Sequence, residues 1–179
     1  MFEKMQIVPY EKYSNKINFC CGNKELDDFI NTDEVKLYER EMLGKTSLAI
    51  LDNKIVAFFT LANTVIRDEW LKKRVKQPKT RQQNQIPSLL IGRFAVQKEY
   101  QHLGLGSYLL KIIVGKALKM SKTVGIRLVV LTAYPENTNW YGKRGFQMCV
   151  EKHLKISRTE YRKRPFMYLD LKQLSGGIE

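Results

Sequence analysis

The order of strand-like and helix-like segments between Pro87 and Ala133 is the strongest constraint on the fold. The run "PSLLIGRFAV" is almost continuously apolar, which is typical of a strand covered on both faces of a sheet. Apolar residues then recur at helical spacing from Leu105 to Met120, and "RLVVLTA" indicates a second buried strand. This order predicts a βαβ unit whose two strands are parallel.

Shorter segments precede this unit. "QIVPY" predicts a short strand, and residues 20–43 predict two short helices, the first capped by Asn23 and the second by Thr32 or Asp33. "TSLAILDNKIVAFFTLAN" predicts a hairpin that turns at Asp52 and Asn53. Residues 67–86 are polar and basic, so we expect a short helix and then an exposed loop.

The segments after the unit complete the expected fold. "NTNWYGKRG" predicts a short helix that ends near Gly145, and "FQMCVEKHLKI" and "RPFMYLDL" predict late strands. We therefore expect an α/β protein of the α+β type, with one domain over residues 1–179 and a central mixed sheet that carries helices on both faces.

The net charge of +13, from 31 basic and 18 acidic residues, limits the classes of molecule that the protein is expected to bind. Such a field attracts phosphate-rich molecules, including nucleic acids and nucleotide cofactors, and it repels small polycations. General solubility explains the same charge equally well, so both interpretations stay open.

The three cysteines and the hydropathy indicate the compartment. Cys20, Cys21 and Cys149 form no CxxC pair and are odd in number, which favours free thiols over a disulfide framework or a metal site. The first residues lack an apolar secretory core, and no apolar run has the roughly 18 residues that a membrane span needs. We expect a cytoplasmic protein without a membrane or metal partner.

Two glycines lie between the predicted central strand and the long helix, in "YQHLGLGSYLL". Backbone N–H groups at a helix start attract anions, and Gly104 and Gly106 have no Cβ to block a phosphate. The sequence has no GxxxxGK[ST] motif here, and Leu109 replaces the third glycine of a dinucleotide motif. The turn therefore either binds another phosphate ligand or only lets the helix pack on its strand.

The neighbouring residues resemble a known family. "RFAVQKEYQHLGLGSYLL" is similar to the acetyl-CoA-binding segment of the GNAT N-acetyltransferases, in which a strand precedes the pattern [RQ]-x-x-G-x-[GA]. Gln101, Gly104 and Gly106 fill that pattern, and "AYPENTNWYGKRGFQ" is similar to the second signature of the family. The resemblance covers roughly a third of the chain and implies the GNAT fold with a βαβ core that binds acetyl-CoA as cosubstrate.

The resemblance also implies where acetyl-CoA is held. The end of the central strand, Phe94, Ala95 and Val96, would receive the pantetheine arm, with backbone groups of Phe94 and Val96 pairing like an added strand. The pyrophosphate would rest on the backbone of the glycine turn: Gln101, His102, Leu103, Gly104, Leu105, Gly106 and Ser107.

In the second signature, Tyr141 and Asn137 are the candidate residues. The resemblance implies direct attack of a primary amine on the thioester in a ternary complex, and the phenol of Tyr141 would give the leaving thiolate a proton or a hydrogen bond. Packing beside Trp140 is the alternative for Tyr141, and helix capping is an alternative for Asn137. We assign no general base, because Glu99 and Glu136 fit solvated turns equally well.

The acceptor is open at this point. Two basic stretches, residues 72–81 and 152–164, would flank an acceptor cleft in the resembled fold, although solvated loops or attraction for the 3′-phosphate of CoA explain them too. "CGNKELDDFI" is similar to the start of toxin acetyltransferases, which implies aminoacyl-tRNA as acceptor and an antitoxin protein as partner. A protein or small-molecule amine acetyltransferase, and an inactive module that binds nucleic acid, are the alternatives. A homodimer is among the assemblies that the sequence allows.

Overall fold

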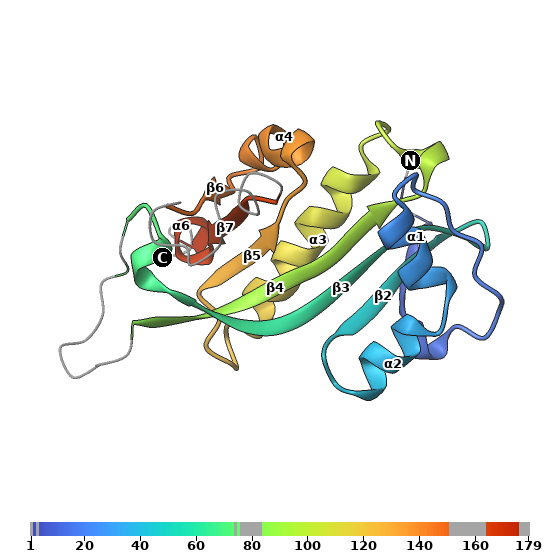
Figure 1. Ribbon diagram of the computed structural model, residues 1–179, viewed down its shortest axis with the longest axis horizontal. Coiled ribbons are helices and arrows are strands. Elements are labelled where there is room, and N and C mark those ends of the chain that lie inside the picture. Colours follow the sequence, from blue (N-terminus) through green and yellow to red (C-terminus); the bar gives the residue numbers. More distant parts are fainter. Residues whose placement is uncertain (1, 3, 74, 76–83, 151–163, 176–179) are drawn as a thin grey trace. The chain divides into compact units, whose positions relative to one another are not determined.

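The computed structural model describes residues 2, 4–73, 75, 84–150 and 164–175. Within these residues, seven strands form one sheet in the order β1-β2-β3-β4-β5-β7-β6 (Figure 1). The pairs β1–β2, β2–β3, β5–β7 and β6–β7 are antiparallel, and β4 and β5 are parallel. This mixed sheet confirms the expected fold class and its βαβ unit.

The elements follow one another along the chain as expected. The strands are β1 (Gln6–Pro9), β2 (Lys45–Leu51), β3 (Lys54–Arg67), β4 (Gln85–Val96), β5 (Leu128–Thr132), β6 (Gln147–Met148) and β7 (Phe166–Asp170). The α-helices are α1 (Lys24–Asn31), α2 (Glu34–Arg40), α3 (Leu105–Met120), α4 (Thr138–Gly142) and α6 (Leu171–Ser175). The 3-10 turns are η1 (Tyr10–Lys12), η2 (Asp68–Trp70), η3 (Lys98–Tyr100) and η4 (Pro135–Asn137).

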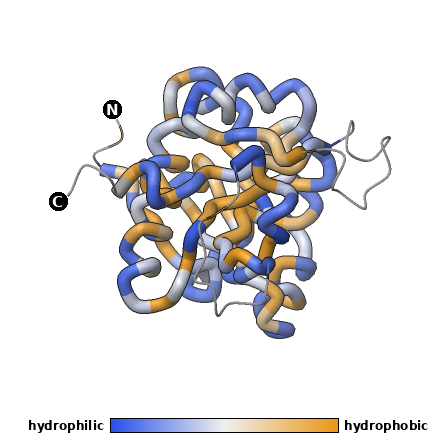
Figure 2. The backbone as a smooth tube through the Cα atoms, turned by 90° about the vertical axis from the view of Figure 1, so that its left-hand side faces the viewer, coloured by the Kyte–Doolittle hydropathy of each residue, from blue (hydrophilic) through white to orange (hydrophobic). Residues whose placement is uncertain are grey.

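Contacts between residues divide the chain into two compact units. The first comprises Met1–Ala62 and Ile91–Ile113, and the second comprises Asn63–Leu90 and Val114–Glu179. Strands β3 and β4 and helix α3 each contribute residues to both units. Figure 2 shows hydrophobic stretches of the backbone that alternate with hydrophilic ones along the chain.

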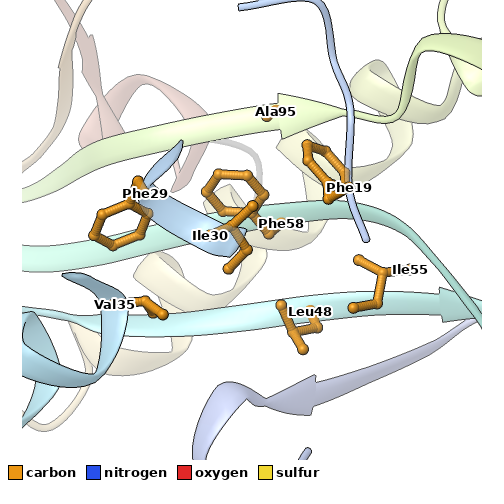
Figure 3. Packing of buried hydrophobic residues seen from close by; sticks show 8 residues of the cluster. All are labelled: Phe19, Phe29, Ile30, Val35, Leu48, Ile55, Phe58 and Ala95. Atoms are coloured by element: carbon orange, nitrogen blue, oxygen red, sulfur yellow. The ribbon is translucent and has the colours of Figure 1, made fainter. Parts of the chain in front are cut away.

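In the first unit, α1 and α2 cover strands β2, β3 and β4 with a cluster of apolar side chains (Figure 3). Phe29 from α1 and Phe58 from β3 are fully buried, and their ring centroids lie 6.1 Å apart. Burying a side chain of this size contributes about 2 kcal/mol, so the cluster fixes the helices on the sheet. The cluster consists of Phe19, Phe29, Ile30, Val35, Leu48, Ile55, Phe58 and Ala95.

Local signals explain the helix starts and the hairpin of this unit. Asn23 caps α1, because its side chain accepts a hydrogen bond from Leu26 N at 3.3 Å. For α2 the side chain of Thr32 accepts from Glu34 N at 3.3 Å, whereas Asp33 makes no capping bond. Asp52 and Asn53 have φ values of 48° and 60°, as the two central residues of a type I′ hairpin turn require.

In the second unit, a short parallel ladder joins β4 to β5, with Ser88–Leu90 facing Leu128–Val130. Strand β5 also pairs with β7 through Thr132. Arg127, just before β5, donates two hydrogen bonds to the carboxylate of Asp170 at the end of β7, at 2.6 and 2.8 Å. These contacts fix the register of β5 against β4 and β7.

Strand β3 continues to Arg67, past the end at Asn63 that the hairpin pattern predicted, and the basic break follows it. A single 3-10 turn, η2, takes the place of the short helix, and residues 74 and 76–83 of the expected loop lie outside the described residues. Of the strand expected in "FQMCVEKHLKI", β6 covers Gln147–Met148, and residues 151–156 of that segment lie outside the described residues. Among the described helices, none is long and apolar enough to cross a membrane.

Candidate functional site

The turn between β4 and α3 is an exposed backbone loop in the first unit. After Val96 the chain makes the 3-10 turn η3 and reaches α3 at Leu105. His102 and Gly104 both have positive φ, at 60° and 88°, so the backbone is left-handed at two places within three residues. A glycine fits this conformation without strain. A Cβ added to Gly104 would meet nothing within 4 Å, so the space beside it is open.

The N–H groups of this turn are available to a ligand. Among the described residues, the N–H groups of residues 102–106 donate no well-aligned backbone hydrogen bond, and the first such bond runs from Tyr108 N to Gly104 O at 3.1 Å. Helix α3 has 16 residues and no acidic side chain in its first turn, so the positive end of its dipole is not neutralised there. This arrangement suits an anion such as a pyrophosphate.

The side chain of Gln101 holds the turn in place. Its Nε2 donates to the carbonyl of Cys21 at 2.8 Å and to the carbonyl of Val96 at 2.9 Å. An amide nitrogen carries two protons, so both are used. Gln101 therefore positions the backbone, and its side chain has no N–H left for a phosphate.

A second glutamine, which the sequence analysis did not single out, supports the same region. Gln97 Oε1 accepts from Cys20 N at 2.8 Å, and Lys98 N donates to Cys20 O at 2.9 Å. With the bond from Gln101 to Cys21, these contacts fasten the segment before α1 to the turn before α3. The contacts join residues about eighty positions apart, and no local pattern in the sequence indicates them.

Replacing Gln101 by methionine is expected to lower the free energy of unfolding by about 1–3 kcal/mol, because two carbonyls lose their donor while the side-chain volume is kept. Chemical denaturation measures this loss. Gln6→Met, at the exposed start of β1, is the control and should change stability by less than about 0.5 kcal/mol. An equally small effect at Gln101 would contradict the positioning role.

The last residues of β4 lie on alternating faces. Ala95 belongs to the cluster under α1 and α2, so Phe94 and Val96 point to the opposite face of the strand. Both are half-buried, and the carbonyl of Val96 already accepts the bond from Gln101. The β4–β5 ladder contains Ser88–Leu90, and Phe94–Val96 lie beyond its last pair.

Tyr141 lies in the second unit, on α4. Its ring packs edge-on against Trp140 at 4.8 Å and against Phe146 at 5.6 Å, measured between centroids, and 9% of the residue is exposed. Burial raises the pKa of the Tyr141 phenol to about 12. Within the described part of the chain, no group accepts a hydrogen bond from its hydroxyl. The phenol is thus protonated at neutral pH and has a donor to offer.

Asn137 stands at the N-cap position of α4, but its side chain makes no capping bond. It is exposed, and its backbone N donates to Tyr134 O at 2.9 Å. The capping alternative is therefore not the arrangement found, and the side-chain amide faces solvent.

Two of the three cysteines, Cys21 and Cys149, are poor nucleophiles in this fold. Burial raises the pKa of the Cys149 thiol to about 12. Burial, followed by a hydrogen bond with Asp27, raises the pKa of Cys21 to about 12. Since the thiolate is the reactive form, neither thiol is activated at neutral pH. His153, the histidine nearest to Cys149 in the sequence, lies outside the described residues.

The expected basic stretches are described only in part. Lys72 and Lys73 are exposed, and Arg164 lies over the ring of Tyr134, with its Cζ 4.8 Å from the centroid. The other basic residues of the two stretches, Arg74, Lys76, Lys79, Arg81, Lys152, Lys155, Arg158, Arg162 and Lys163, lie outside the described residues.

Comparison with models of known protein families identifies the family of this chain. Residues 44–148 match the Acetyltransferase (GNAT) domain, so the chain belongs to the GNAT family of acetyltransferases. The match contains both the glycine turn and Tyr141. The resemblance predicted from the two sequence signatures is thereby confirmed.

Individual relatives add detail. The chain is 24% identical over 116 residues to a tRNA-acetylating toxin of Mycobacterium tuberculosis, covering 65% of this chain and 68% of the toxin. Its fold is similar to that of AtaT complexed with acetyl-methionyl-tRNAfMet, with TM-score 0.79, 18% identity, and 96% and 97% of the two chains covered. A tyrosine-to-phenylalanine mutant of KacT gives TM-score 0.80 and 18% identity, with 97% and 98% covered.

Proposed function

We propose that this protein transfers the acetyl group of acetyl-CoA to the α-amino group of an aminoacyl-tRNA. Membership of the GNAT family supports the acetyl transfer. The similarity to a tRNA-acetylating toxin over 65% of the chain is the observation that carries the choice of acceptor. The net charge of +13 fits a polyanionic acceptor.

In this proposal the cosubstrate contacts come from residues of the two sequence signatures. The free N–H groups of residues 102–106 hold the pyrophosphate, Phe94 and Val96 lie along the pantetheine arm, and Asn137 contributes its amide. Acetyl-CoA supplies the activated acyl group when it is bound. The protein supplies position and hydrogen bonds, and no cysteine is needed as an acyl carrier.

In the chemical step the amine nitrogen attacks the thioester carbonyl, a C–N bond forms, and the C–S bond then breaks. The amine proton leaves to solvent, because the amine of an aminoacyl ester is less basic than a lysine side chain. Tyr141 is the catalytic residue. With a pKa of about 12 it acts first as a hydrogen-bond donor to the developing thiolate, whose proton can follow from the phenol or from water.

The wider role that we propose is that of a toxin in a toxin–antitoxin pair, acting in the cytoplasm and held inactive by an antitoxin protein. A solved relative supports this role: a mutant of the toxin AtaT is known bound to the C-terminus of the antitoxin AtaR, with TM-score 0.72 to this chain. A toxin that modifies charged tRNA must work where translation takes place.

Acetylation of charged tRNA tests the proposal directly. The protein is incubated with acetyl-CoA and each aminoacyl-tRNA in turn, and mass spectrometry of the nuclease digest should detect N-acetylated aminoacyl-adenosine for at least one amino acid. Uncharged tRNA is the control and should give no product. If acetyl-CoA raises the melting temperature but no charged tRNA is modified, the acceptor is wrong and a protein or metabolite amine takes its place.

A further inference from the structure

Arg93 lies on β4 in the first unit, on the strand face that carries α1 and α2. Ala95, two residues further on, packs in the cluster with Phe29 (Figure 3), and residues two apart on a strand share a face. The Cζ of Arg93 is 3.7 Å from the ring centroid of Phe29 and 4.8 Å from that of Tyr38. The guanidinium therefore rests in the corner between a ring of α1 and a ring of α2.

Both rings are held in place. Phe29 is 1% exposed, and the two rings meet edge to face at 85°, with centroids 5.9 Å apart. The Tyr38 ring sits tightly over Gly44, where an added Cβ would lie 2.7 Å from Tyr38 Cε1. The two rings that contact the guanidinium are thus fixed before any ligand arrives.

The charge of Arg93 has no partner within the part of the chain that the structure describes. No hydrogen bond or ion pair involves its guanidinium there, although the residue is half-buried. The buried acid beside Tyr38, Glu39, instead accepts from Thr46 N at 2.7 Å and lies 3.6 Å from Lys45. Stacking uses the face of a guanidinium and leaves its in-plane N–H groups available. Two of these N–H groups can donate to a phosphate as a bidentate pair.

We propose that Arg93 binds a phosphodiester of the nucleic-acid acceptor, which places the amine for transfer. This rests on the proposed function. In an aminoacyl-tRNA the amine is carried by a ribose whose 5′ carbon bears a phosphodiester, so the acceptor brings a phosphate within a few bonds of the reacting group. The +13 charge favours an acceptor that carries phosphates over an amine that carries none.

This phosphate is not the pyrophosphate of the cosubstrate. Arg93 precedes the end of β4 at Val96 by three residues, which is about 10 Å of strand, whereas the free N–H groups follow that end. Arg93 is therefore a binding residue for the acceptor, and its loss should leave the affinity for acetyl-CoA unchanged.

Two stable mimics of the acceptor test the proposal. Puromycin carries a free α-amine on an aminonucleoside without a phosphate, and cytidylyl-puromycin adds one phosphodiester at the 5′ position. We expect the wild-type protein to bind cytidylyl-puromycin at least ~10-fold more tightly than puromycin, and Arg93→Gln to lose that preference. Arg93→Lys keeps the charge and loses the planar fork, so its preference for cytidylyl-puromycin should lie between that of the wild type and that of Arg93→Gln.

Arg40→Gln is the matched control, because Arg40 is an exposed arginine on α2 that lies against Glu41. It should keep the preference for cytidylyl-puromycin. For tRNA itself, the slope of log affinity against log salt should fall by about 1 in Arg93→Gln, an effect that a purely structural role would not produce. The melting temperature of each variant checks its fold.

The proposal is overturned if Arg93→Gln keeps the wild-type preference, if the wild-type protein shows none, or if Arg93→Gln weakens acetyl-CoA as much as the phosphodiester. Failure of the proposed function looks different. A wild-type protein that prefers cytidylyl-puromycin but acetylates no charged tRNA keeps the phosphate site and rejects the reaction.

Discussion

Replacing Tyr141 by phenylalanine is expected to lower kcat by roughly 10²–10³-fold and to leave the affinity for acetyl-CoA within about twofold. The reason is that the substitution removes only the hydroxyl, which acts on charge that develops in the transition state. The ring packs against Trp140 and Phe146, so phenylalanine fits the same space and the fold is kept. Single-turnover acetylation and calorimetric titration of acetyl-CoA measure the two quantities.

The pH profile supplies an independent check on Tyr141. Since burial raises its pKa to about 12, the phenol stays protonated, and wild-type kcat should show no loss from tyrosine ionisation near pH 10. The free energy of unfolding should depend on pH for the same reason. The contribution of the buried neutral phenol is complete below pH 10 and declines between about pH 10 and 12. Turnover in Tyr141→Phe equal to that of the wild type would remove Tyr141 from the mechanism.

Replacing Gly104 by valine is expected to weaken acetyl-CoA binding by roughly 10–100-fold. Gly104 has a φ of 88°, where a β-branched residue is strained, and its side chain would enter the open space beside the free N–H groups. A bound phosphate would then lose one or two charge-assisted hydrogen bonds, each contributing about 1.5–3 kcal/mol. Isothermal titration with acetyl-CoA gives the loss directly.

Gly22 offers a matched control for this substitution. Its φ is also 88°, and an added Cβ likewise meets nothing within 4 Å, but it lies before α1 and outside the turn. Gly22→Val should therefore lose similar stability, about 1–2 kcal/mol, and keep the affinity for acetyl-CoA. If both variants bind acetyl-CoA as tightly as the wild type, the glycine turn is not the pyrophosphate site.

The sheet and its βαβ unit were predictable because their signals are local and strong. The apolar run that became β4, the helical spacing of α3 and the Asp52-Asn53 turn each point to one structure. The ambiguity at α2 was also local: Thr32 and Asp33 are both good caps, and only the backbone geometry shows that Thr32 supplies the bond. Strand β3 outran its expected end because exposed and buried residues continue to alternate up to Arg67.

The sequence predicts a set of candidate site residues, but it does not predict the contacts that these residues make. Motif spacing indicated Gln101 and the glycines as candidate residues for the cosubstrate. It did not indicate that the side chain of Gln101 donates both of its N–H groups to backbone carbonyls. Arg93 carried no signal, since its stacking depends on two helices that lie more than fifty residues earlier. Long-range side-chain contacts of this kind arise only when the chain folds.

The two bonds from Gln101 also account for a feature of the family pattern, which allows arginine or glutamine at this position. The two carbonyls belong to Cys21 and Val96, residues on separate segments, so one side chain must carry at least two N–H donors at its end. Glutamine and arginine meet that demand with planar groups, whereas glutamate and methionine do not. In this chain, the residue at position 101 therefore serves the architecture of the loop, separately from any contact with the cosubstrate.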